Sequence, residues 1–316
     1  MHEPVGLVGL GLMGTAMSTR LLAAGHHVVG FDVSSTAREA HEARGGEVAA
    51  TSAGAVARCR LVILSLPSGQ ISRSVCLDPD GLAGAARPGT VVLETSTVDP
   101  EEAERLGAEL RSRGLVFCDA ALSGSSDMVA RGDTLAMVGG DATAVDVATP
   151  VLSAFCREVR HVGGVGHGMR AKLVVNQILA LNRFALAEGL VLAEAMGLDL
   201  EQMLAVLQAS AAYSRAMDMW GQRMVERRFD DPVSRIRMHN KDAQVTLAAG
   251  RRHRAPMFAT TQLNAFVQVA LANGMGEADN SAIIEVLRTL AGLTASTSPR
   301  PASAATNPTV LRRPRS

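Results

Sequence analysis

The sequence predicts a doubly wound α/β domain with a parallel sheet, followed by an all-helical domain. Three observations lead to this fold class. Short, almost continuously apolar segments alternate with helical segments up to residue 162, which is typical of strands buried on both faces of a parallel sheet. A glycine-rich segment follows at 163–168, and signals for strands are absent after it. From there on, apolar residues recur with a helical period.

We therefore expect two domains and a tail. Residues 1–162 would form the sheet domain, and residues 163–293 a helical domain that begins with one long inter-domain helix at 169–196. Residues 294–316 are rich in Ser, Thr, Pro and Ala and are expected to be disordered. A chain of 316 residues has room for two such domains.

Each element follows from a local pattern of apolar residues. A short strand is expected directly before Gly9, and the further expected strands lie at 27–31, 61–66, 90–94, 115–119, 134–138 and 158–162. Helical periodicity fills the gaps between strands, for example at 100–113 and 142–155. In the second domain, further helices are expected at 200–209, 214–227, 237–249, 257–273 and 278–290.

A glycine motif of the form G-x-G-x-x-G connects the first expected strand to the first helix. It reads Gly9-Leu10-Gly11-Leu12-Met13-Gly14. The first glycine permits a tight turn, the second lets the backbone approach a pyrophosphate, and the third lets the helix pack closely on its strand. The unpaired N–H groups of the helix would face the anion. Taken alone, the motif also fits any tight strand-to-helix turn.

An acidic residue stands where a dinucleotide would need one. Asp32 follows the second expected strand, roughly 20 residues after the glycines. A carboxylate there can accept hydrogen bonds from a ribose 2′-hydroxyl and would repel a 2′-phosphate. The alternative is a cap for the helix near 34–36. Strand, glycines and acid together predict a Rossmann-type domain that binds NAD, with NADP less favoured.

The composition argues against several classes of partner. The 31 basic and 31 acidic residues balance, and aromatic residues make up only 3%, so we expect no nucleic-acid partner. No apolar run is long enough to span a bilayer, and the N-terminus does not resemble a signal peptide, so no membrane association is expected. The four cysteines are scattered and no histidine pair has metal-ligand spacing, so we expect no metal site and a cytoplasmic protein.

One lysine is the candidate catalytic group. Lys172 lies in the first turns of the long expected helix, just after the glycine-rich hinge, so its amine can face the cleft between the domains. Asn176 lies one turn later on the same face and could hold the substrate or the lysine. A lysine that extends from the domain boundary into solvent is the alternative, and spacing alone does not decide between the two.

These residues resemble the motifs of the β-hydroxyacid dehydrogenase family, whose members include 3-hydroxyisobutyrate dehydrogenase and tartronate semialdehyde reductase. The resemblance extends to about residue 293. Besides the glycine motif, the matching segments are Leu66-Pro67, Ser96-Thr97, Asp119 to Ser125 (compared with D-A-P-V-S-G-G), Gly166-x-Gly168-x-x-x-Lys172-x-x-x-Asn176, and Lys241-Asp242.

The resemblance implies an enzyme that transfers a hydride between NAD and a small β-hydroxyacid, such as 3-hydroxyisobutyrate or tartronate semialdehyde and glycerate. Lys172 would be the general acid/base, and Asn176 would take part in catalysis and substrate binding. Leu66, Pro67 and Lys241 would bind the cofactor with the glycine motif and Asp32. A general base near neutral pH needs a lowered lysine pKa, which burial or a nearby cation such as Lys241 would provide.

The resemblance also implies roles for Ser123, Gly124, Thr97 and Lys241, each with an ordinary alternative. Ser123 and Gly124 would begin a helix at the end of a strand and bind the substrate carboxylate, or would simply cap that helix. Thr97 would touch the ribose or the nicotinamide, or cap the next helix. Lys241 would close the cleft over cofactor or substrate, or form an exposed ion pair with Asp242.

Departures from the family pattern leave the particular acid open. Ala121 replaces a proline and Ser125-Ser126 replaces glycine, and the segments 212–215 and 234–237 point to no firm substrate, although a polar, hydroxylated acid is compatible with them. The alternative functions are an enzyme like imine reductase or 6-phosphogluconate dehydrogenase, and a non-catalytic dinucleotide-binding scaffold. The long apolar helix suggests a homodimer or homotetramer.

Overall fold

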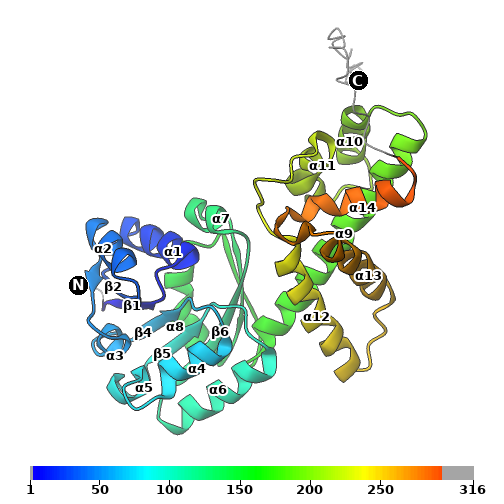
Figure 1. The fold of residues 1–316 in the computed structure, drawn as a ribbon. Helices are drawn as coiled ribbons and strands as arrows, with labels where there is room; N and C mark the ends of the chain where they lie inside the picture. Colours follow the sequence, from blue (N-terminus) through cyan, green and yellow to red (C-terminus); the bar gives the residue numbers. More distant parts are fainter. Residues whose placement is uncertain (1–2, 294–316) are drawn as a thin grey trace, which may run out of the picture.

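A computed structural model describes residues 3–293 and shows a sheet domain joined to a helical domain by one long helix (Figure 1). The sheet has eight strands in the order β3-β2-β1-β4-β5-β6-β7-β8. The strands are β1 (Val5–Val8), β2 (Val28–Phe31), β3 (Glu47–Val48), β4 (Leu61–Leu64), β5 (Val91–Glu94), β6 (Val116–Ser123), β7 (Leu135–Gly139) and β8 (Glu158–Gly163).

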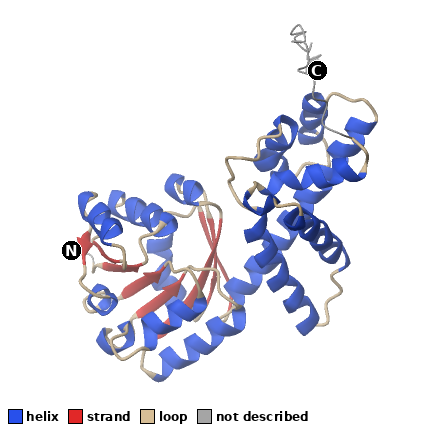
Figure 2. Ribbon diagram, in the orientation of Figure 1, coloured by secondary structure: helices blue, strands red, loops and turns tan. Residues whose placement is uncertain are grey.

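Helices cover both faces of this sheet (Figure 2). In the sheet domain they are α1 (Leu12–Ala23), α2 (Ser35–Ala43), α3 (Ser52–Val56), α4 (Gly69–Leu77), α5 (Leu82–Ala85), α6 (Pro100–Ser112), α7 (Ser126–Arg131) and α8 (Ala142–Leu152). The doubly wound architecture predicted from the sequence is confirmed. Apolar strands that alternate with helices have both faces of their sheet buried in this arrangement.

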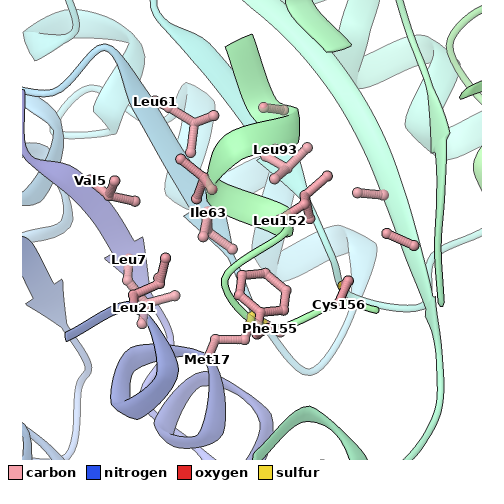
Figure 3. Close-up of a cluster of buried hydrophobic side chains, with 14 of the residues drawn as sticks. Val5, Leu7, Met17, Leu21, Leu61, Ile63, Leu93, Leu152, Phe155 and Cys156 are labelled. Carbon is pink, nitrogen blue, oxygen red and sulfur yellow. The ribbon is translucent and has the colours of Figure 1, made fainter. Parts of the chain in front are cut away.

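Neighbouring residues of a strand pack into different hydrophobic clusters, one on each face of the sheet. Leu7 of β1 and Ile63 of β4 face α1 and the end of α8, where Leu21 and Phe155 complete the cluster (Figure 3). Val8 faces the opposite side, in a second cluster with residues of α3 to α6. This alternation is the two-residue period of an extended strand, and it explains why the strands are apolar throughout.

One strand pair departs from the expected parallel sheet. β6 pairs with β7 in antiparallel orientation, with Ser123 opposite Leu135, whereas every other neighbouring pair in the sheet is parallel. β6 also extends to Ser123, beyond the expected end at residue 119. The expectation that Ser123 and Gly124 begin a helix is therefore wrong: the cap of α7 is Ser125, whose Oγ accepts a hydrogen bond from the N–H of Met128 at 3.4 Å.

The helical domain is built on α9 (His167–Ala195), which runs from the sheet domain through the second core (Figure 1). The other helices are α10 (Leu200–Ala209), the π-helical turn η1 (Met217–Gly221), α11 (Gln222–Glu226), α12 (Ile236–Arg252), α13 (Phe258–Ala272), the short 3₁₀ turns η2 (Met275–Glu277) and η3 (Asn280–Ala282), and α14 (Ile283–Leu290). The predicted tail at 294–316 lies outside the described residues. Within residues 3–293, no helix meets the length and apolarity needed to cross a bilayer.

Candidate active site

The three glycines of the motif lie at the carboxyl end of β1 and have distinct surroundings. Gly9 has a φ of 98°, and a Cβ there would come within 2.1 Å of the Ser65 carbonyl oxygen. A Cβ on Gly14 would come within 1.9 Å of the Gly9 carbonyl oxygen. A Cβ on Gly11 would meet nothing within 4 Å. Two glycines thus close the turn tightly, while Gly11 faces open space at the N-terminus of α1.

Asp32 is tied to this glycine loop. Its Oδ2 accepts a hydrogen bond from the N–H of Leu10 at 2.7 Å, and its Oδ1 accepts one from the N–H of Ser34 at 2.8 Å. The cap of α2 is Ser34, not Asp32, because the Ser34 Oγ accepts the hydrogen bond from Ala37. The carboxylate therefore stands beside the glycine loop with lone pairs that remain for a ligand.

The turns after β4 and β5 are joined by side chains. Ser96 Oγ accepts a hydrogen bond from the N–H of Leu66 at 2.8 Å, and the buried Glu94 carboxylate accepts one from the N–H of Ser96 at 2.9 Å. Pro67 and Thr97 are exposed at this same edge of the sheet. Thr97 does not cap α6, because Asp99 fills that role.

The start of α9 is fastened to β6 by one buried carboxylate. Asp119 is fully buried, and its two oxygens accept hydrogen bonds from the N–H groups of Gly166 at 2.6 Å and Met169 at 2.8 Å. Burial raises the pKa of Asp119, and these backbone hydrogen bonds oppose that shift. Gly168 approaches so closely that a Cβ there would lie 2.5 Å from the Met137 carbonyl oxygen. The position of the first turn of α9 is therefore determined by the sheet.

Lys172 lies one turn further along α9, and its amine points into the protein. The Nζ donates a hydrogen bond to the Leu122 carbonyl oxygen on β6 at 2.7 Å. Burial lowers the pKa of Lys172, and the neighbouring Asp242 carboxylate partly opposes this. Of the two causes that we expected, burial therefore acts on this pKa, whereas Lys241 does not contribute.

Asn176 contacts an acid of α12 instead of the lysine. Its Nδ2 donates a hydrogen bond to Asp242 Oδ2 at 3.3 Å. Burial raises the pKa of Asp242, while Lys172 and Lys241 lower it. Lys241 itself is exposed. The structure thus brings together Lys172, Asn176 and Asp242, with Lys241 at the periphery.

These residues line a cavity of about 620 Å³ between the two domains. The sheet domain contributes Ser123, Gly124, Ser125 and Met128, and the helical domain contributes Lys172, Val174, Val175, Asn176, Ile178, Leu179, Asn182, Arg215, Met219, Trp220, Val233, Ser234 and Asp242. The expected substrate residues Ser123 and Gly124 therefore share one cavity with the expected catalytic lysine.

Sequence reasoning missed the individual roles of several acids at this site. Glu94 and Asp119 lie at or near the ends of buried apolar strands. An unpaired carboxylate is costly to bury, so an acid in such a position indicates a side chain with specific hydrogen-bond partners. Asp242 was noticed only as the neighbour of Lys241. Its contact with Asn176 depends on how α12 packs against α9, which no local pattern reveals.

No group of three or more His, Cys, Asp or Glu side chains within residues 3–293 is arranged to hold a metal ion. The cysteines Cys59, Cys76, Cys118 and Cys156 are buried and free.

A Rossmann-type glycine loop, an acid beside it and a half-buried lysine in the cleft define a class of protein, the nicotinamide-dependent oxidoreductases. Comparison with known families agrees. Residues 4–163 match the model of the NAD binding domain of 6-phosphogluconate dehydrogenase. Residues 166–287 match the model described as NAD-binding of NADP-dependent 3-hydroxyisobutyrate dehydrogenase.

Individual relatives give the same result. The chain is 37% identical to the NAD-dependent L-serine dehydrogenase of Pseudomonas aeruginosa over 218 residues. This alignment covers 69% of this chain and 73% of the relative. It is 31% identical to the 3-sulfolactaldehyde reductase of Escherichia coli, over 92% of this chain and 98% of that one. The solved structure of Mycobacterium tuberculosis 3-hydroxyisobutyrate dehydrogenase with L-serine has a TM-score of 0.83 and 30% identity, covering 91% of this chain and 100% of that one.

The chain belongs to the β-hydroxyacid dehydrogenase family and is an oxidoreductase that acts on the CH–OH group of hydroxyacids. The resemblance drawn from the sequence motifs is thereby confirmed. The matches favour neither a non-catalytic scaffold nor an imine reductase. The family models establish NAD(P)-binding domains without distinguishing NAD from NADP.

Proposed function

We propose that the protein is an NAD-dependent dehydrogenase of a small β-hydroxyacid, in which Lys172 is the general acid/base. The observation that carries this proposal is the half-buried Lys172, whose amine donates to the Leu122 carbonyl oxygen and which lines the same inter-domain cavity as Ser123 and Gly124. Lys172, Asn176, Ser123 and Gly124 would bind the substrate.

The residues at the edge of the sheet fit the cofactor. Gly11 leaves the space that a pyrophosphate needs, since a Cβ there would contact nothing within 4 Å. No side chain caps the N-terminus of α1, so its N–H groups can bind an anion. Asp32 would hold the ribose, and Leu66, Pro67 and Thr97 would line the nicotinamide half. When bound, the nicotinamide accepts or supplies the hydride.

The surroundings of Lys172 suit proton transfer at the substrate hydroxyl. A neutral amine has two N–H groups and one lone pair, and the hydrogen bond to the Leu122 carbonyl oxygen orients them. Burial favours this neutral form, which accepts the hydroxyl proton during oxidation, and the charged form returns a proton to the carbonyl oxygen during reduction. Asn176 and Asp242 would position the substrate beside the amine.

Replacing Lys172 tests this proposal. Lys172→Met should lower kcat about 10²- to 10⁴-fold while leaving the dissociation constant of NADH within about threefold, because a positioned acid–base group contributes to the chemical step. Arg170→Met is the control, since Arg170 lies on the same helix, pairs with Glu104 and does not line the cavity. Turnover of β-hydroxyacids at the wild-type rate by Lys172→Met would exclude the lysine from catalysis.

The preference for NAD over NADP rests on Asp32. Its carboxylate would repel a 2′-phosphate, and both of its oxygens are held by backbone N–H groups, so it cannot easily turn away. We expect kcat/KM to be at least about tenfold higher with NAD⁺, and Asp32→Ser to reduce that ratio. A wild-type preference for NADP⁺ would contradict the assignment.

The assembly and compartment follow from surface and thiol chemistry. Apolar side chains of the helical domain are exposed outside the cavity, including Leu192, Met196, Val269 and Phe258, the last at 85%. Such side chains on neighbouring helices are typical of subunit contacts, so the protein would form a homodimer or homotetramer. The buried free cysteines agree with a reducing, cytoplasmic setting.

A further inference from the structure

The cavity contains a cation that the proposed chemistry does not use. Arg215 precedes η1 and lines the same cavity as Lys172. Its Nη2 lies 3.1 Å from Oδ2 of Asp133, while Oδ1 of the same carboxylate lies 2.8 Å from Nη1 of Arg157. Two guanidinium groups thus share one carboxylate, and one positive charge is left over. Only one nitrogen of Arg215 is engaged, so most of its donors are available.

The other charged groups of the cavity compensate one another. Of the residues that line it, Lys172, Asp242 and Arg215 are the charged ones. Lys172 and Asp242 lie close enough to shift each other's pKa in opposite directions. Arg215 is therefore the cation that attracts an anion from solution into this cavity.

The cavity is also longer than a minimal hydroxyacid. Its wall on α9 extends from Lys172 to Asn182, ten residues and about 15 Å along a helix. A four-carbon acid spans only about 5 Å at ordinary bond lengths. Leu179, Met219 and Trp220 contribute apolar surface to the same cavity. Within the described residues, the Asn182 side chain forms no hydrogen bond.

We propose that the substrate carries a second carboxylate, separated from the reacting hydroxyl by a short carbon chain, and that Arg215 binds it. This inference rests on the proposed function, because the hydroxyl end is positioned at Lys172. The planar guanidinium matches a carboxylate with two parallel hydrogen bonds, and the apolar wall accommodates the methylene groups between the two acids. The substrate class is thus a β-hydroxy diacid.

The chain contains a native probe for this site. Trp220 is its one tryptophan and lines the cavity, so intrinsic fluorescence reports occupancy directly. The test titrates the full-length protein, with NADH present, with 3-hydroxyglutarate and 3-hydroxyadipate and with their ω-amides, which keep the shape and remove the second charge. The same compounds are then assayed for turnover with NAD⁺.

Two arginines that share Asp133 provide a matched pair of variants. Arg215→Leu should weaken diacid binding about 10- to 100-fold and amide binding less than about threefold, since a hydrogen bond to a charged group is lost only with the diacid. Arg157→Leu removes the other half of the same ion-pair cluster but does not line the cavity, so diacid binding should stay within about threefold. Arg215→Lys, which keeps the charge and loses the planar fork, should fall between wild type and Arg215→Leu.

Each outcome decides the inference. Equal binding of diacid and amide by the wild type, no binding of any diacid, or equal losses in Arg215→Leu and Arg157→Leu would overturn it. Diacid binding that depends on Arg215 without any turnover would support the second-carboxylate site and contradict the proposed proton transfer at Lys172. Turnover of monoacids at a rate that Arg215→Leu leaves unchanged would support the proposed dehydrogenation at Lys172 and refute the second-carboxylate site.

Discussion

The carboxylate of Asp119 offers a direct test of how the sheet positions the catalytic helix. Asp119→Asn keeps the size and shape of the side chain but replaces one acceptor oxygen with an N–H donor. One of the two backbone N–H groups, of Gly166 or Met169, then faces another donor at a distance of 2.6–2.8 Å. The start of α9 must therefore shift or lose a hydrogen bond.

The size of the effect follows from two opposing contributions. Losing one buried hydrogen bond to a charged group and weakening the other costs about 2–4 kcal/mol. Removing a carboxylate whose pKa is raised by burial returns part of that cost, because the neutral amide is easier to bury. We expect a net loss of about 1–3 kcal/mol in the free energy of unfolding. We also expect kcat to fall at least about tenfold, since Lys172 is one turn beyond the displaced residues.

Urea denaturation and steady-state kinetics measure both effects. The control is Asp199→Asn, because Asp199 caps α10 through a hydrogen bond from the N–H of Gln202 at 2.9 Å, and asparagine caps helices as well as aspartate does. An Asp119→Asn variant with wild-type stability and wild-type kcat would show that the carboxylate does not hold the start of α9.

Two further predictions concern the same edge of the sheet. Gly11→Ala should leave the denaturation midpoint nearly unchanged and weaken NADH binding at least about tenfold, whereas Gly14→Ala should destabilise the fold by about 1–3 kcal/mol or more, because its Cβ would overlap a backbone oxygen. Equal stability of the two variants would contradict the packing. Burial raises the pKa of Glu94 from 4.5 to about 7, so between these values the folded state holds one proton more than the unfolded chain. This group therefore lowers the stability as pH rises, by at most about 3 kcal/mol, and Glu94→Gln should remove that part of the pH dependence of urea midpoints. An unchanged pH profile in Glu94→Gln would rule this out.

The fold was largely predictable because its signals are local. β1, β4 and β5 are short apolar segments between helical patterns, and α10 lies where its apolar period places it. The antiparallel pairing of β6 with β7 was not predictable in this way, since strand direction depends on the route of the chain around α7. Periodicity reports which faces are buried, not which neighbour a strand chooses.

The site was predictable to a different degree. Helical phase was enough to place Lys172 and Asn176 on one face of α9. The partners of these side chains were not, because the Leu122 carbonyl oxygen and Asp242 come from elements about 50 and 70 residues away in sequence. The direction of the lysine pKa shift depends on these partners and on burial, which only the tertiary structure supplies.

The use of lysine in this chain supports its chemical role. Lysine occurs only at positions 172 and 241, while the chain contains 29 arginines. Arginine satisfies most needs for positive charge but cannot release a proton near neutral pH, whereas a buried lysine can. The acceptor of the Lys172 amine is a carbonyl oxygen, which accepts a stronger hydrogen bond from the charged amine than from the neutral one, so it is burial and not this hydrogen bond that favours the neutral form. Burial lowers the pKa of Lys172 and Asp242 raises it. Because the two effects oppose each other, the amine can both accept and release the proton that the reaction transfers.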